Sequence, residues 1–306
     1  MKKLLALSLT LMLTISMAGC GSEDAPDSSA GSASDASDAS DTSAGSSDDD
    51  AAGDSGTTGN TDDSAGGEDA GESDSAYVKE KGTLVVGITD FEPMDYKDAD
   101  GNWIGFDADL ASAFAESLGV SVEFVEIDWD NKILELDGKT IDCVWNGMTL
   151  TEEVTSSMEC SNAYCNNAQV VIVPADKADD YQDVESLSGL NFAVEAGSAG
   201  EEQANEHNLT CTPVKQQSDA LMEVAAGTSD AAIIDSLMAA AMVGEGTGYA
   251  DLTYTVGLNN EEYGVGFRKG SDLAPALNDF FKTSYADGSM KECAEKYGVQ
   301  AALAEQ

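Results

Sequence analysis

Short apolar runs alternate with amphipathic stretches along residues 77–306. Runs of four to eight apolar residues predict strands, and apolar residues spaced three or four apart predict helices. The predicted strands are Thr83–Ile88, Val120–Ile127, Thr140–Trp145, Gln169–Pro174, Asn191–Glu195, Asp230–Ile234 and Glu262–Phe267. Helices are predicted for residues 107–118, 131–136, 218–226, 236–243, 272–285 and 290–297, and another begins at Gly200. Asp107 is the expected N-cap of the first helix, and Gly119 is expected to end it. This alternation is typical of an α/β architecture with parallel sheets, in which ligands bind at the carboxyl ends of strands.

A different pattern occupies the first twenty residues. Lys2 and Lys3 precede an apolar run, residues 4–17, of signal-peptide length. The segment Met17-Ala18-Gly19-Cys20 resembles a lipobox, whose cysteine is lipidated and begins the mature chain. The alternatives are an ordinary cleaved signal peptide and a transmembrane helix, although the run is shorter than the ~20 residues that a bilayer requires. We predict an extracytoplasmic protein, held on the outer face of the cell membrane by acyl chains on Cys20.

Residues 21–76 consist almost entirely of Ser, Asp, Gly, Ala and Thr, with no Lys, Arg or aromatic residue. Such a segment cannot bury enough apolar surface to offset the entropy lost on ordering. We predict a disordered acidic tether with an r.m.s. reach of roughly 40 Å.

The charge of the chain excludes one class of partner. It has 58 Asp and Glu against 14 Lys and Arg, a formal net charge of −44. This balance excludes electrostatic attraction to nucleic acid and argues against lying flat on anionic lipid. Charge alone does not distinguish a well-solvated surface from one that attracts cationic ligands.

Cysteine usage points to neither a metal site nor a full set of disulfides. Five cysteines follow Cys20, namely Cys143, Cys160, Cys165, Cys211 and Cys293. Their odd number leaves at least one thiol unpaired within the chain, and their spacing matches no metal signature, so we expect no metal and no cofactor. A disulfide between Cys160 and Cys165 is compatible with the spacing but not required by it.

Several segments, in the right order over nearly all of residues 79–300, resemble family 3 extracellular solute-binding proteins. The first lobe is marked by the aromatic-x-Pro turn after the first strand, by GFDADLA and by the small-residue GMT turn, residues 146–149, after the third strand. LSGLNFAVEAGSAGEE and TSDAAIIDSLMAA resemble the two β–turn–α units of the second lobe, and YGVGFRKGSD resembles the returning strand. The resemblance implies an α/β, two-lobe periplasmic-binding-protein-like fold (type II). Its lobes are residues 77–172 with 264–306, and 173–263, joined by crossover segments near 171–175 and 259–265.

The same resemblance implies a function. It predicts capture of a small polar solute, an amino acid or related amine-bearing compound, between hinged lobes. It also predicts delivery of that solute to the permease subunits of an ABC importer, by a monomer that is not an enzyme.

Contacts from the first lobe are implied at the aromatic-x-Pro turn, at Trp129 and in the GMT turn. They are Asp90, Phe91, Trp129, Asn146, Gly147 and Thr149. Two aromatic faces grip an aliphatic or cationic side chain, while glycine admits close approach of the backbone and a Thr hydroxyl forms hydrogen bonds. The alternatives are core aromatic residues and a purely structural turn.

Contacts from the second lobe are implied at Ser198, Glu195 and Asp235. The turn Gly197-Ser198-Ala199 opens a helix, whose free amides and dipole suit a carboxylate. Asp235 matches the carboxylate that holds a solute's α-amino group. Glu195 adds negative charge to the cleft. A plain N-cap is the alternative for both the Ser198 turn and Asp235.

One position departs from the family pattern. Amino-acid binders usually carry, a few residues after the GMT segment, an arginine that clamps the α-carboxylate. Here that position is Val154, and the arginine of this chain, Arg268, lies in the returning strand. The pocket therefore favours a cationic or amine-bearing solute, although Thr149, the 197–199 amides or Lys132 are alternative partners for a carboxylate.

Two other function classes compete with solute capture. Some proteins of this fold resemble dehydratases or peptidoglycan lyases, so a cleft enzyme is one alternative. Against it, the chain has one histidine, His207, and no recognisable nucleophile–base pair. A ligand-sensing or adhesion lipoprotein is the other alternative.

Overall fold

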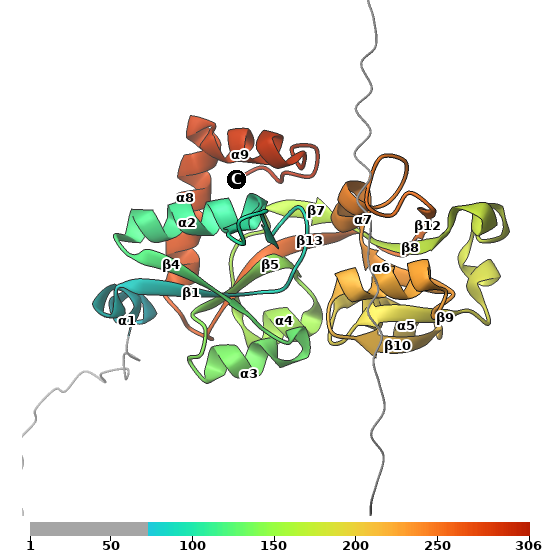
Figure 1. Ribbon diagram of the computed structural model, residues 1–306. Coiled ribbons are helices and arrows are strands. Elements are labelled where there is room, and N and C mark those ends of the chain that lie inside the picture. The colour runs from blue at the N-terminus through green and yellow to red at the C-terminus, as the bar shows by residue number, and fades with distance from the viewer. Residues whose placement is uncertain (1–72) are drawn as a thin grey trace, which may run out of the picture. The chain divides into compact units, whose positions relative to one another are not determined.

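The computed structural model describes residues 73–306, which form two α/β lobes (Figure 1). The predicted signal peptide with Cys20, and residues 21–72 of the predicted tether, lie outside the described residues. Among residues 73–306, no helix has both the length and the apolarity of a membrane span.

The folded part begins earlier than the predicted end of the tether. Helix α1 (Asp74–Lys81) is capped by Ser73, whose hydroxyl accepts from the Ala76 amide at 3.0 Å. The Ser73 hydroxyl also donates to Asp272 at 2.6 Å, and Arg268 binds Asp74 at 2.9 Å. Residues 74–76, predicted as part of the tether, are therefore helical. The partners of Asp74 and Ser75 lie about 195 residues further along the chain, so no local pattern predicts this helix.

The first lobe is built on a mixed sheet with the strand order β4-β1-β5-β13-β6, in which β7 also pairs with β13. Its strands are β1 (Thr83–Ile88), β4 (Ser121–Glu126), β5 (Cys143–Thr149), β6 (Glu159–Cys160), β7 (Cys165–Asn167) and β13 (Glu261–Phe267). Its helices are α2 (Phe106–Leu118), α3 (Lys132–Asp137), α4 (Glu152–Ser157), α8 (Leu273–Asp287) and α9 (Ser289–Tyr297). A small ribbon of β2 (Tyr96–Lys97) and β3 (Trp103–Ile104) and a 3₁₀ turn (Trp129–Asn131) complete it.

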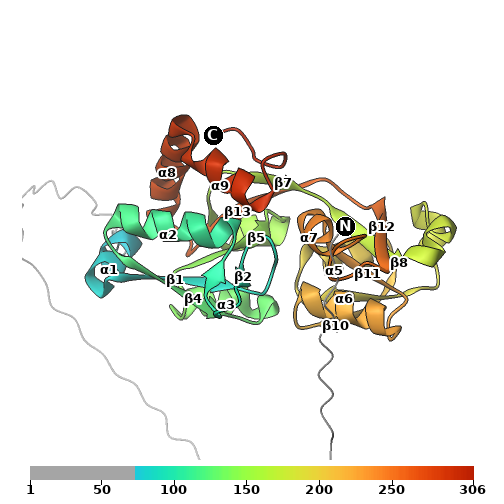
Figure 2. The same ribbon diagram turned by 45° about the horizontal axis from the view of Figure 1, so that its top comes forward.

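The second lobe has a five-stranded sheet with the order β10-β9-β11-β8-β12. Its strands are β8 (Gln169–Pro174), β9 (Asn191–Glu195), β10 (Thr210–Val214), β11 (Ala231–Asp235) and β12 (Leu252–Gly257). Its helices are α5 (Ala199–Glu206), α6 (Gln217–Ala226) and α7 (Ser236–Met242), with 3₁₀ segments at Ala175–Asp180 and Val184–Leu187. Figure 2 shows the chain passing from β7 into β8 and back towards β13.

The sheets are mixed rather than parallel, and the lobe boundaries differ from the predicted ones. Strands β13, β8 and β12 pair antiparallel with their neighbours, because the chain enters and leaves the second lobe along them. All of β8 belongs to the second sheet and all of β13 to the first. The first crossing therefore lies at Ala168, before the predicted 171–175, whereas the second, residues 258–260, overlaps the predicted 259–265. Strand pairing, not composition, decides the lobe to which each residue belongs.

Two local predictions are wrong. The third strand runs from Cys143 to Thr149, so the expected turn at 146–149 is part of β5, where it pairs with β13. Gly105, not Asp107, is the N-cap of α2. The Asp107 carboxylate is buried and instead accepts from the Gly147 amide and the Tyr164 hydroxyl, each at 2.7 Å. Both errors arise from contacts between residues far apart in the chain.

Aromatic packing holds the C-terminal helices on the first lobe. Trp145, Tyr164 and Phe281 are fully buried, with ring centroids 5.5–6.4 Å apart. Aromatic pairs at this spacing add about 0.5–1.5 kcal/mol each beyond the burial of their area. The lobe is thus completed by a segment that follows the second lobe in sequence.

The five cysteines among the described residues are free thiols, so Cys160 and Cys165 are not bridged.

Candidate functional site

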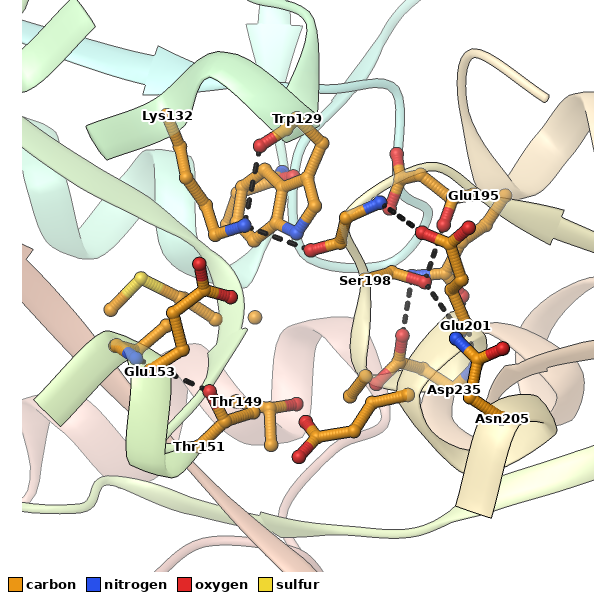
Figure 3. Close-up of a pocket in the computed structure, with 18 of the residues that line it drawn as sticks. Trp129, Lys132, Thr149, Thr151, Glu153, Glu195, Ser198, Glu201, Asn205 and Asp235 are labelled. Atoms are coloured by element: carbon orange, nitrogen blue, oxygen red, sulfur yellow. Dashed lines mark hydrogen bonds between the residues drawn. The ribbon is translucent and has the colours of Figure 1, made fainter. Parts of the chain in front are cut away.

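A cavity of about 410 Å³ is lined by residues of both lobes (Figure 3). The first lobe contributes the end of β5 and the segments around Trp129 and Val154. The second contributes the end of β9, helix α5, the start of α6 and the end of β11. This location at the carboxyl ends of strands is the one expected for a ligand site in an α/β fold.

Seven of the nine predicted contact residues line this cavity. They are Trp129, Asn146, Gly147, Thr149, Glu195, Ser198 and Asp235. Asp90 instead lines a separate hollow with Glu92 and Lys97. Phe91 is 2% exposed and packs edge-to-face on Tyr263, with ring centroids 6.3 Å apart, behind the cavity wall.

Residues 146–149 at the end of β5 present their backbone to the cavity rather than the Asn146 side chain. The Asn146 amide nitrogen donates to Asp95 at 2.8 Å and to the Thr89 carbonyl at 3.0 Å, which turns the side chain into the first lobe. A Cβ on Gly147 would lie 2.6 Å from the Phe91 ring, and its φ is +54°. Glycine is therefore required here, and Phe91 acts as the support beneath it.

Lys132 bridges the two lobes at one end of the cavity. Its ammonium donates to the Trp129 carbonyl at 3.3 Å and to the Gly197 carbonyl of the second lobe at 2.8 Å. It also lies 5.2 Å from the centre of the Trp129 ring. Burial lowers the pKa of Lys132, while the surrounding carboxylates oppose that shift. The contact fastens the Gly197 turn to the first lobe.

Asp235 lies at the floor of the cavity and is held by four donors. Its Oδ1 accepts from Tyr263 at 2.7 Å, from Gln169 at 3.1 Å and from Asn167, and Oδ2 accepts from Gln217. Asp235 is the N-cap residue of α7, as the alternative had it, but its side chain makes no capping hydrogen bond to that helix. Burial raises the pKa of Asp235 to about 8, and the charge of Glu261 adds to this.

Glu195 differs from Asp235 in having an oxygen without a partner. It is 2% exposed, and its Oε1 has no hydrogen-bond partner among the described residues. Burial, followed by the charge of Asp235, raises the pKa of Glu195 to about 8. An unsatisfied buried carboxyl oxygen costs about 1–3 kcal/mol, and an incoming cation would remove that cost.

The lining of the cavity is strongly acidic. Among the described lining residues, one ammonium (Lys132) faces six carboxyl groups. The carboxyl groups belong to Glu153, Glu195, Glu201, Glu202, Glu206 and Asp235. A low-dielectric cleft lined with one sign of charge concentrates counter-ions, so this cavity attracts cations.

Several of the groups expected to bind a carboxylate are engaged, and the expected arginine is missing. The Gly197 amide donates to Glu201 at 2.7 Å, and the Ser198 hydroxyl donates to the Glu195 carbonyl at 2.7 Å. Val154 is 3% exposed and lines the cavity at the position where an arginine was expected. Arg268 binds Asp74 and main-chain carbonyls beside α1 instead.

Sequence reasoning missed three residues that shape this site. Gln217 donates to Asp235 from the start of α6, and Thr151 and Glu201 line the cavity. The spacing Ser198-x-x-Glu201 is a capping-box signature, so Glu201 was recognisable as a partner of the helix start. No comparable local signal marks Gln217, which reaches Asp235 through tertiary packing.

Comparison with known proteins agrees with this geometry. Residues 84–300 match the bacterial extracellular solute-binding proteins, family 3. The arginine-binding extracellular protein ArtP of Bacillus subtilis (strain 168) is 29% identical over 236 residues, which cover 74% of this chain and 90% of ArtP. A mutant of ArgBP from T. maritima has a TM-score of 0.69 and 31% identity, covering 74% of this chain and 99% of ArgBP.

A second solved structure bears on the enzyme alternative. The ancestral amino acid-binding protein AncCDT-1, a precursor of cyclohexadienyl dehydratase, has a TM-score of 0.67 and 33% identity. It covers 74% of this chain and 99% of its own. These similarities confirm the predicted family and the two-lobe fold.

Proposed function

Because the chain belongs to family 3 of the bacterial extracellular solute-binding proteins, we propose that it captures an amino acid or related amine between its lobes and delivers it to an ABC importer. The observation that carries the ligand assignment is the acidic cavity, where a buried carboxyl oxygen of Glu195 has no partner within residues 73–306. The amine end of the solute faces Glu195 and Asp235. The Trp129 ring covers its aliphatic part.

This function predicts that the body binds one cationic solute and becomes more compact when it does so. The two crossings between lobes are short, so the lobes rotate about them as a hinge. Native mass spectrometry of the purified protein should detect a retained small amine, and small-angle scattering should show compaction when that amine is added back. A protein whose dimensions stay constant at saturating amine would contradict closure.

Anchoring by lipid at Cys20 is part of the proposal. The lipobox and the acidic tether after it support a body held at the outer face of the membrane, with room to move. Replacing Cys20 with Ser should release the protein from the membrane fraction. Wild-type protein found unmodified in the culture medium would contradict the anchor.

We propose binding rather than catalysis, since the curated relatives that match this chain are named as binding proteins. The similarity to AncCDT-1 keeps a dehydratase-like enzyme as the competing candidate. Recovery of the added amine unchanged after prolonged incubation distinguishes the two.

A further inference from the structure

In the second lobe, the Glu201 carboxylate binds the turn at which a solute carboxylate was expected to bind. Glu201 lies in the first turn of α5, and its Oε2 accepts from the Gly197 amide at 2.7 Å. Its own amide donates to the Ser198 hydroxyl at 3.2 Å. Figure 3 shows the Glu201 side chain turned back onto the start of the helix. The negative charge of Glu201 therefore already neutralises the positive end of the helix dipole.

The cavity has no free cationic side chain, among the described residues, that could bind a solute carboxylate. Val154 stands where an arginine was expected and carries no charge. The Lys132 ammonium already donates to two main-chain carbonyls, one in each lobe. A second carboxylate near Gly197 would meet the charge of Glu201 in a partly buried setting, where like charges repel strongly. Glu195, by contrast, has a buried oxygen without a partner among the described residues and lines the same cavity.

We propose that Glu201 serves as a built-in carboxylate, and that the cleft therefore selects carboxylate-free cations, such as diamines and alkyl guanidines, over α-amino acids with the same side chain. This inference rests on the proposed capture of an amine and specifies its class. Glu195 and Asp235 hold one cationic end of the solute. Glu201 excludes the α-carboxylate.

The space beyond the cavity suits an extended cation. A hollow of about 550 Å³ shares Thr149, Thr151 and Glu202 with the cavity and reaches Glu261 and Glu262 near the second crossing. Glu261 is already engaged, since its Oε1 accepts from Thr149 at 2.9 Å and from Gln169 at 2.8 Å. Glu202 and Glu262 are exposed, and they offer a second cationic end its counter-charge.

The test compares cations that differ only in the carboxylate. Calorimetry on the purified full-length chain uses arginine against agmatine and lysine against cadaverine. We expect the decarboxylated member of each pair to bind at least about tenfold more tightly. Tighter binding of arginine and lysine would overturn the inference. Failure of all four compounds to bind would instead overturn the proposed capture of a small cation.

Two variants assign the selectivity to Glu201. Glu201→Gln keeps an oxygen for the Gly197 amide but removes the charge, and Glu201→Ala frees the amide as well. The affinity for arginine relative to that for agmatine should rise about tenfold in Glu201→Gln and at least as much in Glu201→Ala.

Glu206→Gln is the matched control, because Glu206 lines the same cavity on the same helix but binds Gln203 instead of the Gly197 turn. Its arginine-to-agmatine ratio should equal that of the wild type. An equal change of the ratio in Glu201→Gln and Glu206→Gln would show that only overall charge matters, and would overturn the role of Glu201.

Discussion

Glu195→Gln is expected to weaken binding of a cationic solute by roughly thirty-fold to several-thousand-fold. Removing one member of a buried, charged hydrogen bond costs about 2–5 kcal/mol, which corresponds to this range of affinity. Glu195 is the best single target because its Oε1 is buried and has no partner among the described residues. Asp235→Asn would also affect the fold, since four donors surround that carboxylate.

Calorimetry with one cationic amine checks this expectation, and Glu206→Gln is the control. Glu206 lines the same cavity but is exposed, so losing its charge should reduce affinity only slightly. Affinity in Glu195→Gln equal to that of the wild type would show that the amine binds elsewhere.

The pH dependence of the same variant supplies a second measurement. The pKa of Glu195 is raised to about 8 by burial and by Asp235, and a bound cation favours its ionised form. Affinity should therefore rise with pH up to about 8 and then level off, with a smaller rise in Glu195→Gln.

Stability of the solute-free protein should change in the opposite direction. Between the ordinary carboxyl pKa and about 8, the folded protein holds a proton at Glu195 that the unfolded chain has lost. Stability from this group is thus fully present below the ordinary pKa and is lost as the pH rises towards 8. Thermal unfolding at pH 5 and pH 9 should show that Glu195→Gln loses less stability over this range.

Gly197→Ala is expected to weaken solute binding by about tenfold or more by preventing full approach of the lobes. A Cβ on Gly197 would lie 2.8 Å from the Asp130 Cα of the first lobe, closer than such contacts allow. The same turn accepts the Lys132 ammonium, so displacing it also breaks the bridge between lobes. An open arrangement relieves the clash, and the folded lobes themselves are not disturbed.

Gly227→Ala separates this steric effect from backbone strain. Gly197 and Gly227 both have positive φ, +69° and +73°, so alanine carries a similar conformational cost of roughly 1–2 kcal/mol at each position. In the described part of the chain, nothing lies within 4 Å of a Cβ on Gly227. Scattering and calorimetry should show impaired closure and weaker binding in Gly197→Ala alone. Equal losses in the two variants would indicate strain rather than contact between lobes.

The sequence by itself determined the elements whose cause is local. The apolar run Thr83–Ile88 is β1 with the predicted bounds, and Gln169–Pro174 and Asn191–Glu195 are β8 and β9. Hydrophobic periodicity depends only on neighbouring residues, so it predicts strands and helices directly. The resemblance to family 3 solute-binding proteins likewise implied Trp129, Glu195 and Asp235, which line one cavity.

Tertiary structure alone decided where the side chains point and which of their polar atoms stay free to bind a solute. Phe91 supports Gly147 from behind, and Asn146 is turned inward by Thr89 and Asp95, more than 50 residues away. The Glu195 Oε1 has no partner among the described residues because desolvation and partner choice depend on how the two lobes pack together. No local pattern encodes such contacts, since each depends on residues that the chain brings together only after folding.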